Sequence, residues 1–67
     1  MVNNCMNSTN LIPGAIIEHI FQHNWKYFIL SVKKDIEWYY IVSYSLKYHI
    51  FDEFSIKDLN YWKLISK

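Results

Sequence analysis

Aromatic or β-branched side chains occupy six of the nine positions from Glu37 to Ser45, a stretch that reads Glu-Trp-Tyr-Tyr-Ile-Val-Ser-Tyr-Ser. This density of aromatic and β-branched residues, without Gly or Pro, is the strongest strand pattern in the chain. Side chains alternate between the two faces of a strand. One face holds Trp38, Tyr40, Val42 and Tyr44, and the other holds Tyr39, Ile41, Ser43 and Ser45. Both faces carry large apolar groups, so we expect this strand in the interior of a sheet.

The same kind of patterning predicts four further strands and one helical turn. The expected strands cover residues 15–21, 25–34, 36–45, 48–54 and 61–65. Ser55 followed three residues later by Asp58 resembles a capping box, which predicts a single 3₁₀ turn over residues 55–59. Apolar residues at helical spacings also occur, but the β-branched and aromatic density over residues 25–51 favours strands.

The length of the chain, 67 residues, corresponds to one small domain. We expect a flexible, asparagine-rich arm over residues 1–10 and a single folded domain over residues 11–67. A domain of this size buries only about 60% of the surface that its unfolded chain exposes, so its stability margin is thin. Cys5 is the only cysteine, which excludes a disulfide within one chain and a metal site built from several cysteines.

Short strands with brief connections and a helical turn before the last one are expected to curl into a small barrel. Particular residues match a known order of motifs. They are Pro13-Gly14-Ala15-Ile16-Ile17, Tyr40-Ile41-Val42-Ser43-Tyr44, Phe51-Asp52-Glu53-Phe54, Leu59 and Tyr61-Trp62. In this order the chain resembles the SH3-like small barrels, which include Tudor-like and KOW-like modules. From Pro13 to about Ile65, the resemblance implies an all-β, five-stranded SH3-like barrel with one short 3₁₀ turn before the last strand. The chain departs from the pattern in having no glycine at the turns between strands 1 and 2 and between strands 3 and 4.

The charged residues almost balance, with a net charge of +1, and all seven basic residues are lysines. Arginine is the usual residue for bidentate contacts to phosphates and base edges, so its absence lowers the expectation of specific nucleic-acid recognition. No apolar run reaches the roughly 18–20 residues that a membrane helix needs, and the first residues do not resemble a secretory signal. We therefore expect a soluble, cytoplasmic protein without a membrane partner.

Residues suited to catalysis or metal binding are sparse. The histidines are His19, His23 and His49. The first two are four residues apart, which aligns metal ligands on a helix but not on a strand and its turn. Ser43 and Ser45 have no nucleophile elbow or glycine-lined oxyanion site nearby. The neighbours Asp52 and Glu53 point to opposite faces of a strand. We expect no enzymatic activity, no metal, no cofactor and no small-molecule substrate.

Lysines interleaved with aromatic residues are typical of nucleic-acid-binding surfaces. The candidates are Lys26, Lys33, Lys34 and Lys47 for phosphates and Trp25 or Tyr27 for stacking on bases. Six acidic residues nearly balance the lysines, so no basic stripe is expected. A nucleic-acid-binding barrel is therefore the alternative hypothesis rather than the main one.

The surplus of apolar residues is the most informative feature for function. The expected interior consists of Ile17, Phe21, Phe28, Leu30, Val32, Tyr40, Val42, Ile50, Leu59 and Trp62. The apolar residues that remain outside this interior are Ile16, Ile20, Trp25, Tyr27, Ile29, Tyr39, Ile41 and Tyr61. Large exposed apolar patches usually mark contact sites, and Tyr and Trp are enriched in such sites. The predicted partner-binding residues are Trp25, Tyr27, Tyr39, Ile41 and Tyr61. Alternatively, Leu11, Ile12 and the N-terminal arm fold over the remaining apolar surface.

The main hypothesis is a non-enzymatic binding module that acts through contact with another protein or through self-association as a homo-oligomer. The abundance of Ile, Asn, Lys and Tyr suggests an AT-rich coding genome. Together with the small size and the lack of an enzymatic motif, this suggests an accessory or inhibitory protein of a phage or another mobile element.

Overall fold

Residues 6–67, the part that the computed structural model describes, form five strands and one 3₁₀ turn. The elements are β1 (Ile16–His19), β2 (Lys26–Lys34), β3 (Tyr39–Ser45), β4 (Phe51–Ile56), η1 (Leu59–Tyr61) and β5 (Trp62–Ser66). The predicted all-β class, with a 3₁₀ turn before the last strand, is confirmed. The turn begins later than predicted because Asp58, and not Ser55, caps it. The Asp58 side chain accepts a hydrogen bond from the Asn60 amide at 2.9 Å, whereas Ser55 lies within β4.

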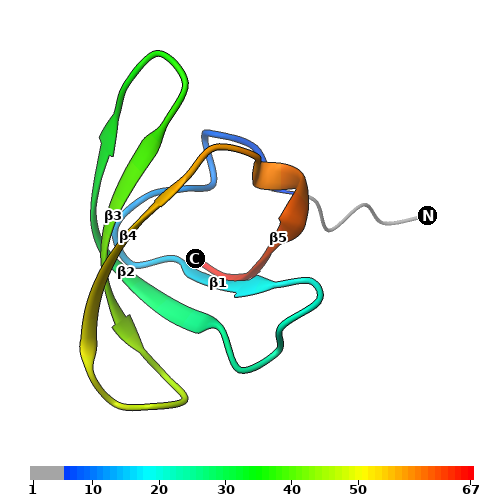
Figure 1. Ribbon diagram of the computed structural model, residues 1–67, viewed down its shortest axis with the longest axis vertical. Coiled ribbons are helices and arrows are strands. Elements are labelled where there is room, and N and C mark those ends of the chain that lie inside the picture. The colour runs from blue at the N-terminus through cyan, green and yellow to red at the C-terminus, as the bar shows by residue number, and fades with distance from the viewer. Residues whose placement is uncertain (1–5) are drawn as a thin grey trace.

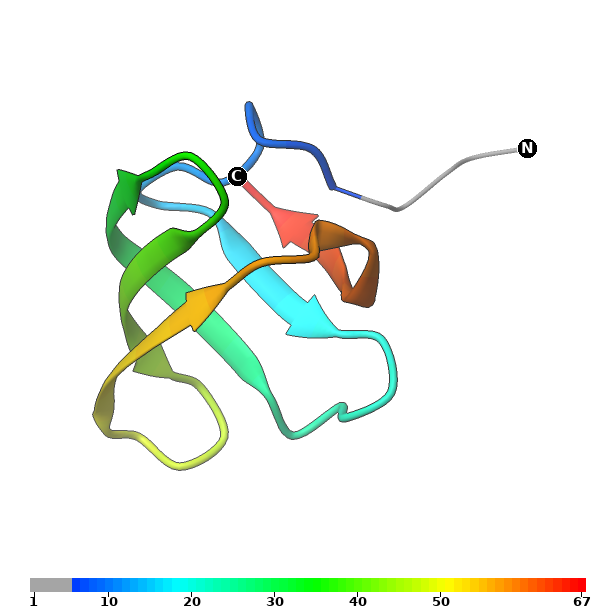
Figure 2. The same ribbon diagram turned by 45° about the horizontal axis from the view of Figure 1, so that its top comes forward.

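The strands form one antiparallel sheet in the order β4-β3-β2-β1-β5, so that β3 lies in the interior of the sheet as expected. The long β2 pairs with β3 along most of its length and with β1 through its first residues, and a register shift between Ile29 and Ser31 marks a bulge. The sheet curls strongly (Figure 1). The η1 turn then carries the chain from β4 across to β5 at the opposite edge (Figure 2).

The curled sheet does not close. Within residues 6–67, β4 pairs only with β3 and β5 pairs only with β1. The rings of Phe54 and Trp62, which come from these two edge strands, stack with centroids 5.6 Å apart and an interplanar angle of 14°. Aromatic packing therefore joins the two edges, and the expected barrel is an open one.

The core lies on the concave side of the sheet. Its buried residues are Met6, Leu11, Ala15, Ile17, Ile29, Ile41, Ile56 and Trp62. The partly buried residues packed against them are Tyr27, Val32, Tyr39, Phe54, Leu59 and Leu64. Met6 and Leu11 belong to the N-terminal segment, and the Lys34 ammonium donates a hydrogen bond to the Ser8 carbonyl at 2.9 Å. This half of the predicted arm thus packs on the core, as in the alternative that it covers apolar surface. Cys5 lies outside the described residues.

The predicted inner faces of β3 and of the first half of β2 are wrong. Phe28, Leu30, Tyr40 and Val42 were expected inside, yet the opposite faces form the core there. Val32 packs against the core as predicted, because the bulge after Ile29 reverses the alternation of β2. The physical reason is the pair of serines on the inner face of β3. The Ser43 hydroxyl donates to the Asp52 carbonyl and the Ser45 hydroxyl accepts from the Tyr48 amide, both at 3.1 Å. Because their polar groups are satisfied, burial costs little. Phe21 and Ile50, also expected inside, lie in turns and are exposed.

The turn between β3 and β4 contains no glycine and instead uses a non-glycine residue with a positive φ. His49 has a φ of 58° and is the only non-glycine residue with positive φ among residues 6–67. Its amide donates to the Ser45 carbonyl at 2.9 Å, which closes the turn. The left-handed conformation disfavours a residue that carries a Cβ atom, so this turn holds local strain at an exposed position.

Replacing His49 with glycine is expected to stabilise the protein by about 0.5 kcal/mol, because removal of the Cβ strain exceeds the added entropy of the unfolded chain. The change appears as a higher midpoint of urea unfolding with an unchanged slope. The matched control is Lys47→Gly in the same turn, where φ is not positive; it should lower the midpoint. Equal losses from both substitutions would show that His49 is not strained.

Candidate functional site

Aromatic side chains gather around His19, at the end of β1. Pairing of β1 with β2 and β5 brings them together, since the His19 amide donates to the Trp25 carbonyl at 3.0 Å and the Ile20 amide donates to the Tyr61 carbonyl at 2.9 Å. The His19 ring lies edge-on to Trp25 with a centroid distance of 5.0 Å and nearly parallel to Tyr61 at 6.3 Å. We call His19, Phe21, Trp25 and Tyr61 the aromatic cluster.

A groove adjoins this cluster on the open side of the sheet, between β4 and the start of β5. It has a volume of 230 Å³ and is lined by Trp25, Tyr27, Phe54, Ser55 and Trp62. The Tyr27 and Phe54 rings are 4.7 Å apart and Phe54 stacks on Trp62. We call this site the aromatic groove. Each aromatic ring of its walls is packed against another ring.

The electrostatics of the groove favour a neutral Tyr27 hydroxyl. Burial raises the pKa of Tyr27, and the negative charge of Asp52 raises it further, as does Tyr48. The phenol therefore remains protonated at neutral pH, and it can donate a hydrogen bond. Aromatic rings thus form most of the lining of the groove, and Tyr27 also carries a hydroxyl that is protonated at neutral pH.

The predicted partner-binding residues separate into two groups. Trp25 and Tyr61 are 44% and 47% exposed and lie together in the aromatic cluster. Tyr27 was also expected outside, but it is partly buried and packs against the core, with its remaining surface in the groove. Tyr39 and Ile41 instead face the core, where Ile41 is only 1% exposed. The expectation that these two residues lie on the outer face is wrong, because the inner face of β3 is the one that carries them.

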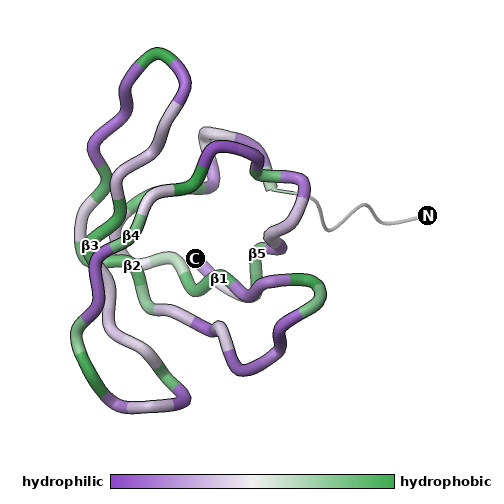
Figure 3. Tube along the Cα trace, viewed as in Figure 1, coloured by the Kyte–Doolittle hydropathy of each residue, from purple (hydrophilic) through white to green (hydrophobic). Residues whose placement is uncertain are grey.

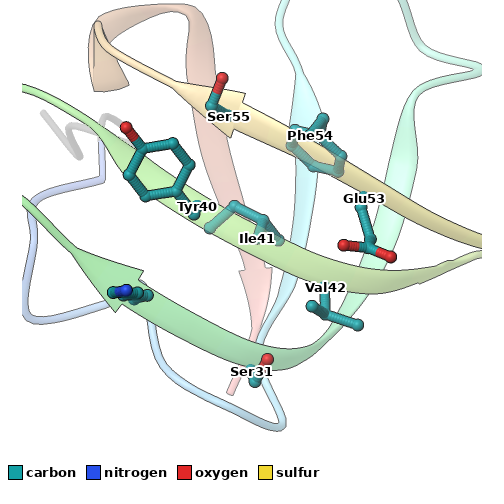
Figure 4. Close-up of a pocket in the computed structure, with 8 residues that line it drawn as sticks. Ser31, Tyr40, Ile41, Val42, Glu53, Phe54 and Ser55 are labelled. Carbon is teal, nitrogen blue, oxygen red and sulfur yellow. The ribbon is translucent and has the colours of Figure 1, made fainter.

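A second exposed apolar surface was not predicted from the sequence, because its residues were expected in the interior. The outer side of β2, β3 and β4 carries large side chains, which we call the outer face: Phe28, Leu30, Tyr40, Val42, Tyr44 and Phe51. A shallow pocket of 530 Å³ lies on it, with Ser31, Tyr40, Val42, Glu53 and Ser55 among its lining residues (Figure 4). The alternation of side chains along each strand correctly predicted that most of these residues share one face of the sheet. That face was wrongly expected to be the buried one.

The tip of the β2–β3 hairpin also carries a hydrophobic residue (Figure 3). Ile36 in this turn is 96% exposed. The neighbouring Trp38 lies beneath the Lys57 ammonium, which is 5.8 Å from the ring centroid. This contact partly covers Trp38 and leaves Ile36 isolated, so the tip is not a continuous patch.

Glu18 forms the main charge cluster of the described residues, on the outer side of β1. Its carboxylate lies 2.8 Å from His23 Nδ1, 3.3 Å from the Lys26 ammonium and 3.4 Å from the Lys63 ammonium. The hydrogen bond with His23 is the largest effect that lowers the pKa of Glu18 from 4.5 to about 2, helped by Lys26 and Lys63 and opposed by burial. Through these contacts Glu18 links the β1–β2 hairpin to β5.

The lysines considered for phosphate binding do not form one surface. Lys26 is paired with Glu18, and it lines a cavity of 370 Å³ together with Lys47. Lys33 and Lys34 lie at the other end of β2, roughly 25 Å away along the strand. Lys34 is also engaged by the Ser8 carbonyl. Phosphate binding by all four together would require them to converge on one strip of surface, which this arrangement does not provide.

The residues considered for catalysis or metal binding are also dispersed. Ser43 and Ser45 are buried and hydrogen-bonded to backbone groups, while His49 is exposed in the turn. Among residues 6–67, no group of three or more His, Cys, Asp or Glu side chains is placed to hold a metal ion. In the same range, no helix has the length and apolar character needed to cross a membrane.

No protein-family model matches the chain, and searches of curated proteins and of solved structures found no significant match. What the chain does must therefore be inferred from its topology and from the chemistry of its exposed side chains.

Proposed function

We propose that the protein is a non-enzymatic binding module of the SH3-like small-barrel type, which recognises another protein through the aromatic groove and the adjoining aromatic cluster. The bulged β2, shared between β1 and β3, and the 3₁₀ turn before β5 support the SH3-like assignment. An origin in a phage or another mobile element stays a prediction from composition.

The observation that carries the proposal is the exposure of Trp25 and Tyr61 beside the groove. Nearly half of each side chain is open to solvent although both belong to a packed cluster. Trp and Tyr are the residues that contribute most to protein interfaces when a partner covers them. Because His19 and the neighbouring rings already hold these side chains in place, little conformational entropy is lost when a partner binds.

The groove suits one large apolar side chain of a partner protein. Its 230 Å³ is below the roughly 300–1,000 Å³ typical of small-molecule sites. None of the described residues that line the groove is a lysine. Lys26 lies at the opposite end of β2 from Lys33 and Lys34, so these positive charges are not grouped for a nucleic-acid backbone. A peptide segment with an aromatic or aliphatic anchor is therefore the better match.

A random-peptide library, displayed and selected on the immobilised protein, tests this proposal. We expect enrichment of peptides with a large apolar residue, and Trp25→Ala with Tyr61→Ala should weaken their binding at least about tenfold, since each is placed as a hot spot. The matched control is Trp38→Ala with Tyr40→Ala, because these residues have similar exposures of 38% and 44% and lie outside the groove. Titration calorimetry measures the affinity of the selected peptides for the wild type and for both double variants.

Two results would contradict the proposal. One is a selection in which no peptide is enriched above an unrelated β protein. The other is enrichment of peptides that bind both double variants equally well, which would place the contact elsewhere. Circular dichroism of the variants establishes that they remain folded.

A further inference from the structure

The outer face combines an uncharged apolar strip with one charge on either side of it. Tyr40, Val42 and Tyr44 form the strip along β3, with Tyr40 44% exposed. Lys33 flanks it on β2 and Glu53 flanks it on β4. Neither charged group has an ion-pair partner within residues 6–67. A surface with opposite charges on its two sides can complement itself.

We propose that the outer face binds a second copy of the chain, with a two-fold axis that runs along β3. The outer face meets the aromatic groove on β4, where Phe54 and Ser55 line both. Trp25 and Tyr61, which carry the proposed recognition of a partner protein, are not part of the outer face, so the inference does not depend on that recognition. An isologous contact of this kind uses the same patch on both copies.

The strand register shows what such an axis brings together. The pairs across the outer face form three rows: Lys33–Tyr40–Ser55, Ser31–Val42–Glu53 and Phe28–Tyr44–Phe51. Rotation about β3 places β2 of one copy over β4 of the other. Each Phe28 then lies opposite the other copy's Phe51, which is 74% exposed here. Each Lys33 lies one row, about 7 Å, from the other copy's Glu53, within reach of a lysine side chain.

A second copy fits this face better than other occupants. A nucleic acid or an anionic membrane would need several positive charges, whereas the outer face carries Lys33 and Glu53 in balance. The net charge of +1 means that two copies repel each other only weakly. Face-to-face packing of two sheets is also an ordinary way to bury apolar strand faces.

The size of the outer face determines how tightly two copies are expected to bind each other. Three strands and the length of β3 cover roughly 15 by 23 Å, which is smaller than the about 800 Å² per partner of a standard interface. We therefore expect a reversible dimer that dissociates in the micromolar range. Sedimentation equilibrium of the full chain should show the mass rise with concentration from 8.2 kDa to twice that value.

Charge substitution provides the decisive test. Lys33→Glu makes the flanks of the face entirely acidic, and Glu53→Lys makes them entirely basic. Each variant alone should dimerise at least tenfold more weakly than the wild type. An equimolar mixture of the two should form a heterodimer as tight as the wild-type dimer, because both inter-copy ion pairs are then restored. Unfolding midpoints close to the wild type establish that both variants are folded.

Three results would overturn the inference: a strict monomer at millimolar concentration, self-association that neither single variant weakens, or a mixture that fails to recover it. Self-association lost in Trp25→Ala with Tyr61→Ala would also overturn it, since that outcome places the contact at the aromatic cluster. Unchanged dimerisation of this double variant, together with its loss of peptide binding, would support both proposals.

Discussion

Ile29→Ala is expected to destabilise the protein by about 3 kcal/mol, the typical cost of removing a buried isoleucine side chain beyond Cβ. Ile29 is 0% exposed and lies in the middle of β2. Its amide donates to the Ala15 carbonyl at 2.9 Å and its carbonyl accepts from the Gly14 amide at 2.8 Å, so the surrounding backbone cannot collapse into the cavity. A domain of this length is stable by only about 3–10 kcal/mol. Thermal unfolding should show a midpoint lower by about 15 °C.

The neighbouring residue provides the control for this loss. Leu30 is 39% exposed at the bulge of β2, so Leu30→Ala should cost less than about 1 kcal/mol. Both substitutions remove apolar atoms from adjacent positions of one strand. A larger loss from Leu30→Ala than from Ile29→Ala would mean that the opposite face of β2 is the buried one.

Glu18→Gln is expected to lower the stability at neutral pH by about 2 kcal/mol, a value reduced to allow for the partial exposure of the surrounding lysines and His23. The pKa of Glu18 is lowered from 4.5 to about 2 in the folded protein. Its stabilising contribution is therefore complete above the unfolded pKa and is lost as the pH falls from about 5 toward 2. The difference between wild type and variant should shrink over that window.

The exposed pair of Glu37 and Lys57, 4.0 Å apart, is the control for this pH dependence. Glu37→Gln should change stability by less than about 0.5 kcal/mol, because exposed ion pairs contribute little. Urea unfolding at a series of pH values measures both variants. A difference between wild type and Glu18→Gln that stays constant from pH 2 to pH 6 would contradict the assigned role of the Glu18 cluster.

The strands were predictable because their signal is local. Runs of aromatic and β-branched residues, bounded by polar turns, specify extended backbone without reference to the rest of the chain. The third and strongest signal, which became β3, is the clearest case. The choice of inner face was not local. It depends on partners for the Ser43 and Ser45 hydroxyls that only the β3–β4 hairpin supplies, and on a bulge after Ile29 that interrupts the alternation of β2.

The candidate site was predictable to a similar extent. Trp25 and Tyr61 could be singled out because they are large aromatic residues at the ends of predicted strands. Their meeting across His19 follows from the pairing of β1 with β5, which joins residues far apart in the sequence. The outer face could not be recognised, because two apolar faces on one strand look alike until the volume of the core is known.

Thiol labelling of two adjacent positions of β3 tests most directly which face of the sheet is open. Val42→Cys and Ser43→Cys are made in a Cys5→Ser background, so that each protein has a single thiol, and are labelled with a maleimide in nanomolar solution, where dimers are absent. We predict that the thiol at position 42 reacts nearly as fast as in the unfolded chain. The thiol at position 43 should be protected at least about a hundredfold, since it reacts only when the sheet opens. Rapid labelling at position 43 with protection at position 42 would contradict the account.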